Sequence, residues 1–158
     1  MHAYARGKRA ELELARILWR RGFAVMRAPA SGARAKRIPF PDILAVRYEP
    51  GYMTVLVVEV KLRRERGSIK IARGKAWRIL DYARRSGGEA YVAVKVSSEG
   101  RWYWVPLEEL EPRGDGYTLR LAHYDNALTL DEAIRRARRR LCRAETETPI
   151  ALDDDTLR

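Results

Sequence analysis

The chain has 158 residues, enough for one compact domain with a buried core. Its formal net charge is +11 at pH 7, and 26 of its 32 basic residues are Arg, whose planar guanidinium matches phosphate geometry. We therefore expect a polyanionic partner, although Arg richness is also typical of some genome compositions and of hot habitats. A single cysteine excludes an intrachain disulfide, and one cysteine with two histidines offers no zinc site. No long apolar segment occurs, so we expect no signal peptide, no membrane span and a cytoplasmic protein.

The first part of the chain predicts a helix over residues 5–21, because good helix formers dominate it and Gly22 stands where a helix usually ends. Leu14 and Leu18 lie on its apolar face, and continuing that face back by one turn reaches Glu11. A carboxylate on the inward face suggests a functional role. A favourable interaction with the helix dipole explains it equally well, so both interpretations stay open.

A short strand is expected over residues 23–26, followed by a long loop up to residue 41 that is rich in Pro, Gly, Ser and basic residues. A loop of this length in a small domain is usually either functional or disordered. The basic residues that we expect to contact a polyanion within it are Arg34, Lys36 and Arg37.

The most informative segments are two strands expected over residues 42–47 and 54–62. The second strand places Glu59 and Lys61 within a run of valines. Side chains alternate along a strand, so these two share one face, and antiparallel pairing of the strands would bring Asp42 near Glu59. A solvated surface salt bridge is the ordinary interpretation of such a pair. Here the flanking core residues weaken it, because buried charges need partners or a metal ion to offset desolvation.

A basic stretch over residues 63–73 follows, and we expect Arg63 and Arg64 to contact the polyanion. The next helix is expected over residues 74–86. Ala76, Leu80 and Ala83 give this helix one apolar face, and Ile79 and Tyr82 begin a second apolar face beside it. A helix with two apolar faces must bury both, either against a second subunit or in one broad contact with a sheet.

The rest of the chain predicts three strands, one helix and a tail. The strands are expected over residues 90–96, 102–106 and 117–121, the helix over residues 130–143 and the tail over residues 144–158. The helix begins with a Thr-to-Glu capping box, and the tail, with five acids and one base, is expected to be flexible. Because strands alternate with helices, we expect an α/β fold with one mixed sheet of about five strands flanked by helices, in a single domain over residues 1–143.

Glu11, Asp42 and Glu59 are then expected to converge around a hard cation such as Mg²⁺, which prefers oxygen ligands. Such an ion can activate water for phosphodiester hydrolysis. Lys61 could orient that water or offset the developing charge, and Ser31 on the loop could contact a phosphate. Basic segments flank this acidic site, since residues 1–40 and residues 61–85 each carry ten bases and two acids. Bases that hold the backbone around acids that hold an ion are typical of metal-dependent nucleases.

Pro41-Asp42 followed by Glu59-Val60-Lys61 resembles the P-D…(D/E)-x-K core of the restriction-endonuclease-like nucleases. Three other segments narrow the resemblance to the archaeal Holliday junction resolvases: residues 7–14, residues 22–32 and residues 83–88. The resemblance extends from about residue 4 to residue 105, and more faintly to the last helix.

The resemblance implies a restriction-endonuclease-like fold and a homodimer that binds four-way DNA junctions by shape. It also implies paired nicks in two strands of like polarity, with Mg²⁺ or Mn²⁺ as the cofactor. By motif position the metal ligands would be Glu11, Asp42 and Glu59, with Lys61 stabilising the transition state and Ser31 as the catalytic serine of the loop. Arg27 would contact DNA, and Tyr82 matches an aromatic position near the dimer interface.

The sequence departs from the family pattern at Leu12, where some members carry Arg, and at Ser86, where others carry an aromatic residue. Three other interpretations are compatible with the same residues. One is a nuclease of this chemistry that acts on another DNA structure or on a defined duplex site. A second is a non-catalytic DNA-binding protein built on the same frame. In a third, architectural interpretation, the Arg-rich helix over residues 130–143 is the DNA contact.

Overall fold

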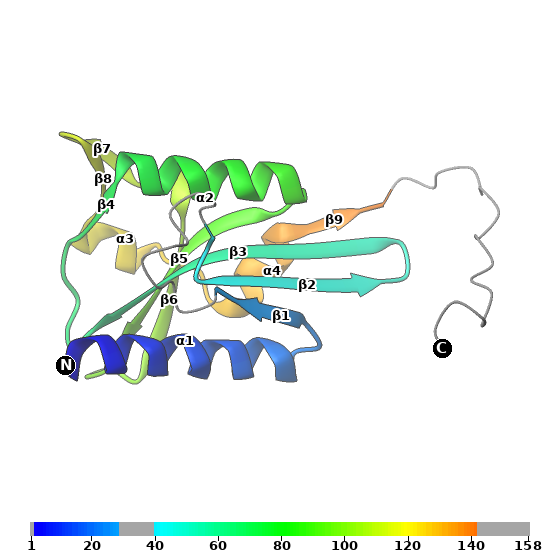
Figure 1. The fold of residues 1–158 in the computed structure, drawn as a ribbon, viewed down its shortest axis with the longest axis horizontal. Helices are drawn as coiled ribbons and strands as arrows, with labels where there is room; N and C mark the ends of the chain where they lie inside the picture. Colours follow the sequence, from blue (N-terminus) through cyan, green and yellow to red (C-terminus); the bar gives the residue numbers. More distant parts are fainter. Residues whose placement is uncertain (1, 29–39, 142–158) are drawn as a thin grey trace, which may run out of the picture.

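The computed structural model describes residues 2–28 and 40–141, with side chains from residue 5 onward. A six-stranded sheet lies at its centre (Figure 1). Five strands follow one another in the order β1 (Ala24–Arg27), β2 (Ile43–Glu49), β3 (Tyr52–Arg63), β5 (Glu89–Val96) and β6 (Arg101–Pro106), and β9 (Arg138–Arg140) pairs with the start of β3. Strands β3 and β5 are parallel and the other pairs are antiparallel, so the predicted mixed sheet is confirmed.

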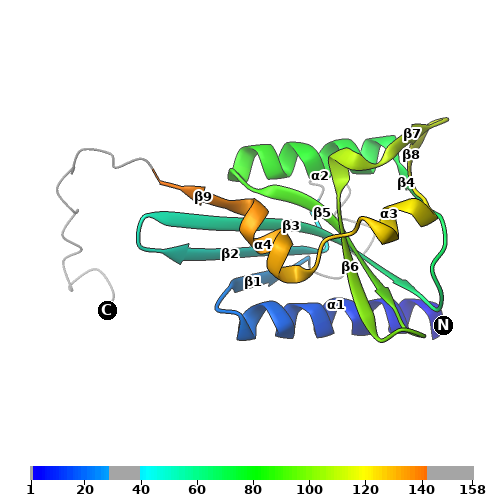
Figure 2. The same ribbon diagram turned by 180° about the vertical axis from the view of Figure 1, so that it is seen from behind.

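Helices cover both faces of this sheet. Helix α1 (His2–Arg20) and helix α4 (Leu130–Ala137) pack on one face, and helix α2 (Arg73–Ser86) packs on the other. Figures 1 and 2 show α1 and α2 on opposite sides of the sheet. A small sheet in the order β4 (Ile69–Ala72), β8 (Gly116–Leu119) and β7 (Glu111–Arg113) lies beside α2, and two short helices, η1 (Leu107–Glu109) and α3 (Leu121–Asp125), complete the described chain.

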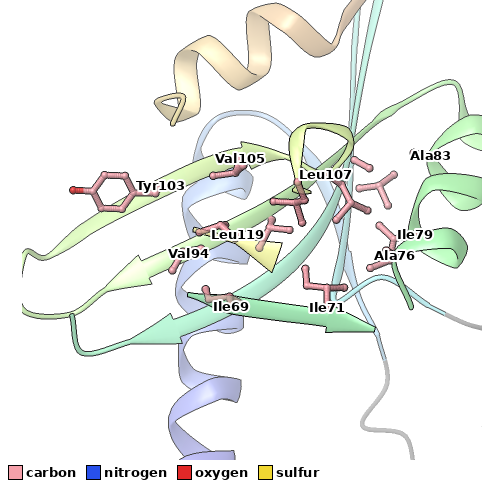
Figure 3. Packing of buried hydrophobic residues seen from close by; sticks show 14 of the residues in the cluster. Ile69, Ile71, Ala76, Ile79, Ala83, Val94, Tyr103, Val105, Leu107 and Leu119 are labelled. Atoms are coloured by element: carbon pink, nitrogen blue, oxygen red, sulfur yellow. The ribbon is translucent and has the colours of Figure 1, made fainter. Parts of the chain in front are cut away.

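Strand β3 contributes to a hydrophobic core on each side of the sheet because its side chains alternate. Val58 and Val60 pack with α1 and α4, whereas Val55 and Val57 pack with α2 and the small sheet. Figure 3 shows part of the second cluster between α2 and the strands. Glu59 follows Val57 in the same alternation, so its side chain is directed to the α2 side of the sheet.

Two consecutive glycines connect α2 to β5. Gly87 has a φ of 65° and ends the helix in the left-handed conformation that favours glycine. The Gly88 amide donates to the carbonyl of Ala83 at 2.9 Å, which closes the helix end. A Cβ on Gly88 would lie 2.8 Å from the carbonyl oxygen of Val55, so the backbone of β3 leaves no space for a side chain there.

The last predicted helix ends earlier than expected, at Ala137 instead of residue 143. Ala137 is buried, but the next three residues are arginines that are all exposed, so no apolar stripe remains to hold a helix on the sheet. Arg138 to Arg140 instead pair with the first residues of β3, and the guanidinium of Arg138 stacks on the ring of Tyr52 at 3.8 Å.

The expectation of a second apolar face on α2 that begins at Ile79 is also wrong. Ile79 is 3% exposed and lies with Ala76 and Ala83 on the face that packs against the sheet. Tyr82 is half-buried. The sequence also left β4, β7 and α3 unrecognised, because each is five residues or shorter. Strands β4 and β7 depend on pairing with β8, and α3 depends on its packing against β6.

In the described ranges 2–28 and 40–141, no helix is long and apolar enough to cross a membrane.

Gly88→Ala is expected to lower the free energy of unfolding by about 1–3 kcal/mol, because the new methyl group must push against the backbone of β3. Gly7→Ala is the matched control. Its Cβ would have no heavy atom within 4 Å, and alanine is the better helix former, so we expect a gain of about 0.5–1 kcal/mol. Urea denaturation of both variants measures the difference, and equal effects would show that the close approach at Gly88 is absent.

Candidate active site

Glu59 is the centre of the candidate site. Its side chain is 0% exposed although it is charged, and it lies near the middle of an apolar strand. The ammonium groups of Lys61 and Lys75 both donate to its Oε1, each at 2.5 Å. Lys61 comes from the same strand two residues on, as predicted, whereas Lys75 comes from the first turn of α2. The other carboxylate oxygen, Oε2, is buried and has no hydrogen-bond partner among the described residues.

Asp42 lies beside Glu59 at the start of β2. The antiparallel register pairs Ile43 with Val58, which places Asp42 next to Glu59 on the neighbouring strand. The Asp42 Oδ2 accepts a hydrogen bond of 2.8 Å from the backbone amide of Val60. The prediction that β2 and β3 bring these two carboxylates together is therefore confirmed by the strand register.

The pKa values of the two carboxyl groups move in opposite directions. Burial, followed by the negative charge of Glu59, raises the pKa of Asp42 to about 6. Burial alone would also raise the pKa of Glu59, but the positive charges of Lys61 and Lys75 outweigh it and hold that pKa below its ordinary value. The site thus contains a carboxylate that stays ionised beside one that titrates near neutral pH.

Glu11 lies elsewhere in this structure. Its Oε2 accepts a hydrogen bond of 3.0 Å from the guanidinium of Arg27, the last residue of β1. Arg27 pairs with Ile43, whose side chain packs in the core on the α1 side of the sheet, whereas Glu59 is directed to the α2 side. In the described part of the chain, no group of three or more His, Cys, Asp or Glu side chains is arranged to hold a metal ion. The structure therefore brings together Asp42, Glu59 and Lys61 but not Glu11.

The other predicted site residues are divided between the described chain and residues 29–39. Arg63 ends β3 and is half-buried, and Arg64 follows it and is exposed, so both lie two or three residues from Lys61. Four predicted residues lie outside the described residues: Ser31, Arg34, Lys36 and Arg37. Ala28, the last described residue before them, lies near Asp42, since its amide donates to the Asp42 carbonyl at 3.1 Å.

Comparison with known proteins shows which family the chain resembles. Residues 2–141 match the model of the archaeal Holliday junction resolvases, Hjc. The chain belongs to this family. It is 31% identical over 131 residues to the crossover junction endodeoxyribonuclease Hjc of Sulfurisphaera tokodaii, covering 83% of this chain and 87% of that protein. A protein of the same name from Sulfolobus acidocaldarius is 30% identical over 131 residues, covering 82% of this chain and 87% of that protein.

The fold agrees with the family as well. The solved structure of Archaeoglobus fulgidus Hjc, a Holliday junction resolvase from an archaeal hyperthermophile, matches with a TM-score of 0.69 at 31% identity. The match covers 80% of this chain and 98% of that one. The resemblance seen in the sequence motifs is thereby confirmed over most of the chain.

Membership of the Hjc family of nucleases implies a divalent metal ion, and the residues present fit one. The Oε2 of Glu59 is a buried acceptor with no hydrogen-bond partner among the described residues, which leaves it available to a cation. Asp42 supplies a second carboxylate beside it. Burial and then the negative charge of Glu59 raise the pKa of Asp42, and a divalent cation would offset that negative charge. Oxygen donors of this kind suit hard cations.

Lys75 is the residue of this site that sequence analysis missed. It stands 16 positions from Glu59 along the chain, in a basic stretch that gives no sign of which base turns inward. Its contact depends on the chain path from β3 through β4 to α2, which places the first turn of the helix beside the strand.

The ion-free protein is expected to lose stability through Asp42 as the pH rises. A carboxyl group whose folded pKa is about 6 and whose ordinary value is 3.8 binds its proton more tightly in the folded state. Its stabilising contribution is therefore complete below pH 3.8 and is lost as the pH rises through about 6. Asp42→Asn keeps the acceptor for the Val60 amide and should raise the free energy of unfolding by about 1–3 kcal/mol at pH 7.5.

Urea denaturation in EDTA at pH 4 and pH 7.5 measures this effect, and the gain should shrink at pH 4. Asp81→Asn is the control, because hydrogen bonds from Arg84 and Arg85 lower the pKa of that carboxyl group. Its removal should give no gain at pH 7.5. A gain from Asp42→Asn of the same size at both pH values would contradict the raised pKa.

Proposed function

We propose that this protein resolves four-way DNA junctions by divalent-metal-dependent hydrolysis of phosphodiester bonds, with Mg²⁺ as the ion and Mn²⁺ as a substitute. The observation that carries the proposal is the buried Glu59 carboxylate, with Asp42 beside it. Two lysines donate to one of its oxygens, and the other has no partner within ranges 2–28 and 40–141. The relatives that bear the name crossover junction endodeoxyribonuclease support the choice of substrate.

In this proposal Asp42 and Glu59 hold the ion, with the carbonyl of Val60 as a further candidate ligand. When bound, such an ion supplies Lewis-acid catalysis to phosphodiester hydrolysis. Lys61, on the same face of β3 as Glu59, is placed to stabilise the negative charge that develops on the phosphate. Glu11 would become a third ligand only after it leaves Arg27. Ser31 is proposed to contact the phosphate or the attacking water.

Basic side chains are proposed to hold the DNA backbone around this acidic site. Arg63 and Arg64 extend from the end of β3, and Arg27 lies at the end of β1. Arg34, Lys36 and Arg37 would contribute from the segment between β1 and β2. Salt-dependent binding is expected from such contacts, because each phosphate contact releases counterions. In this proposal the protein acts on DNA in the cytoplasm, and residues 1–143 form the nuclease domain.

Glu59→Gln is expected to reduce cleavage of a labelled synthetic four-way junction at least about 10³-fold, because the variant keeps the shape of the side chain but loses the charge that holds the ion. Junction affinity should change less than about threefold, since a fully buried side chain makes no contact with DNA. Glu13→Gln, at an exposed position of α1 that pairs with Lys95, is the control and should cleave normally.

Nick mapping with and without EDTA, in competition with duplex DNA of equal length, measures both quantities. Cleavage by Glu59→Gln or in excess EDTA would exclude a metal nuclease centred on this residue. Equal competition by duplex would instead leave the chemistry in place and exclude selectivity for junctions.

The protein is proposed to act as a homodimer, because two symmetric nicks need two sites and each chain contains one Glu59. Tyr82 on α2 is half-buried and is the aromatic residue we propose for the interface. Ile79 is already buried within its own subunit, so any contribution that it makes is through the position of α2.

Tyr82→Asp is expected to raise the dimer dissociation constant at least about tenfold, because a charge in an apolar contact costs more than 1.4 kcal/mol. Sedimentation equilibrium measures the change. Tyr48→Asp, at a residue that is 66% exposed on β2, is the control and should sediment like the unmodified protein. Equal association of both variants would place the interface away from Tyr82.

A further inference from the structure

The second lysine on Glu59 has no role in the function proposed above. Lys75 and Lys61 both donate to the same oxygen, Oε1, at equal distances of 2.5 Å. Lys61 is fixed to the strand that carries Glu59, whereas Lys75 enters from α2. Its side chain is 39% exposed, compared with 26% for Lys61, so Lys75 has the clearer path to solvent.

The position of Lys75 in its helix is unfavourable on local grounds. The first turn of α2 contains Arg73 and Lys75 and no acidic residue, and the cap residue Ala72 makes no side-chain hydrogen bond. Cations at a helix N-terminus oppose the helix dipole. A base at this position gains a compensating interaction from the Glu59 carboxylate.

We propose that Lys75 is a positioning residue of the site, a built-in counterion that neutralises Glu59 in the ion-free protein and weakens ion binding through its charge. The inference rests on the proposed function, since it assumes that a divalent ion binds at Glu59 and Asp42. Two charges of like sign that share one carboxylate repel each other, so ion binding and the Lys75 contact are coupled.

The test is isothermal titration calorimetry of the full chain with Mn²⁺ in the absence of DNA, which measures the affinity for the ion. Lys75→Met should bind Mn²⁺ about three- to tenfold more tightly than the unmodified protein, because one opposing charge is removed. Lys75→Arg keeps the charge and should return the affinity to its original value. Lys70→Met removes the same charge from an exposed position on β4 and should bind Mn²⁺ with unchanged affinity.

Thermal unfolding gives a second readout that needs no cleavage. In EDTA, Lys75→Met should unfold at a lower temperature than the unmodified protein, and saturating Mn²⁺ should raise its Tm by more than it raises that of the unmodified protein. If Lys75→Met does not fold in EDTA, Lys75→Gln replaces it. Glutamine keeps an N–H donor without the charge, so the same tightening of Mn²⁺ binding is expected.

If Lys75→Met, or Lys75→Gln in its place, binds Mn²⁺ with unchanged or lower affinity, the counterion role is overturned and Lys75 has only a structural role. That outcome differs from failure of the proposed function. If the unmodified protein itself binds no Mn²⁺, or if Glu59→Gln binds it equally well, the ion site at Glu59 is wrong and the Lys75 proposal is overturned with it.

Discussion

The structure depends on how one buried carboxylate is kept charged. Glu59 lies in a strand whose neighbouring side chains form cores on both sides of the sheet, where an uncompensated charge costs several kcal/mol. Two ammonium groups from two separate elements provide the compensation. The contact of Lys75 with Glu59 therefore joins α2 to β3 at the site, and the apolar contacts of Val55 and Val57 join them elsewhere.

The two lysines compensate the charge of Glu59 on only one of its two carboxylate oxygens. Both lysines bind the same oxygen, and the other oxygen of Glu59 has no partner in the described structure. Burial and the nearby charge of Glu59 raise the pKa of Asp42, and the Oδ2 of Asp42 accepts a hydrogen bond from the backbone amide of Val60. A buried carboxylate oxygen with no partner among the described residues and a carboxyl group with a raised pKa both cost folding stability. Such sites are common where function and stability compete.

Much of the site follows from local rules that a sequence contains. The alternation of side chains along β3 is enough to place Glu59 and Lys61 on one face, and the antiparallel pairing of β2 with β3 is enough to place Asp42 beside them. The stop of α2 at Gly87 is equally local, because the left-handed conformation of this residue favours glycine. These parts of the fold were correctly predicted for that reason.

The features that the sequence did not predict depend on contacts between segments that are far apart along the chain. Arg138 leaves the helical path because the edge of β3 and the ring of Tyr52 offer it a better contact than a helix with no apolar face. Ile79 turns inward because the sheet, and not a second subunit, covers its side of α2.

Glu11 shows the same limit most clearly. Helical periodicity places it correctly on the inward stripe of α1, at the end where the apolar contacts stop. Periodicity does not say which inward group it meets, and in this structure that group is Arg27. Arg27 is itself half-buried, with an Nε that has no partner among the described residues, so the pair is not a fully satisfied structural bridge. The contact between Glu11 and Arg27 therefore depends on how α1 packs beside β1, which the periodicity of α1 alone does not determine.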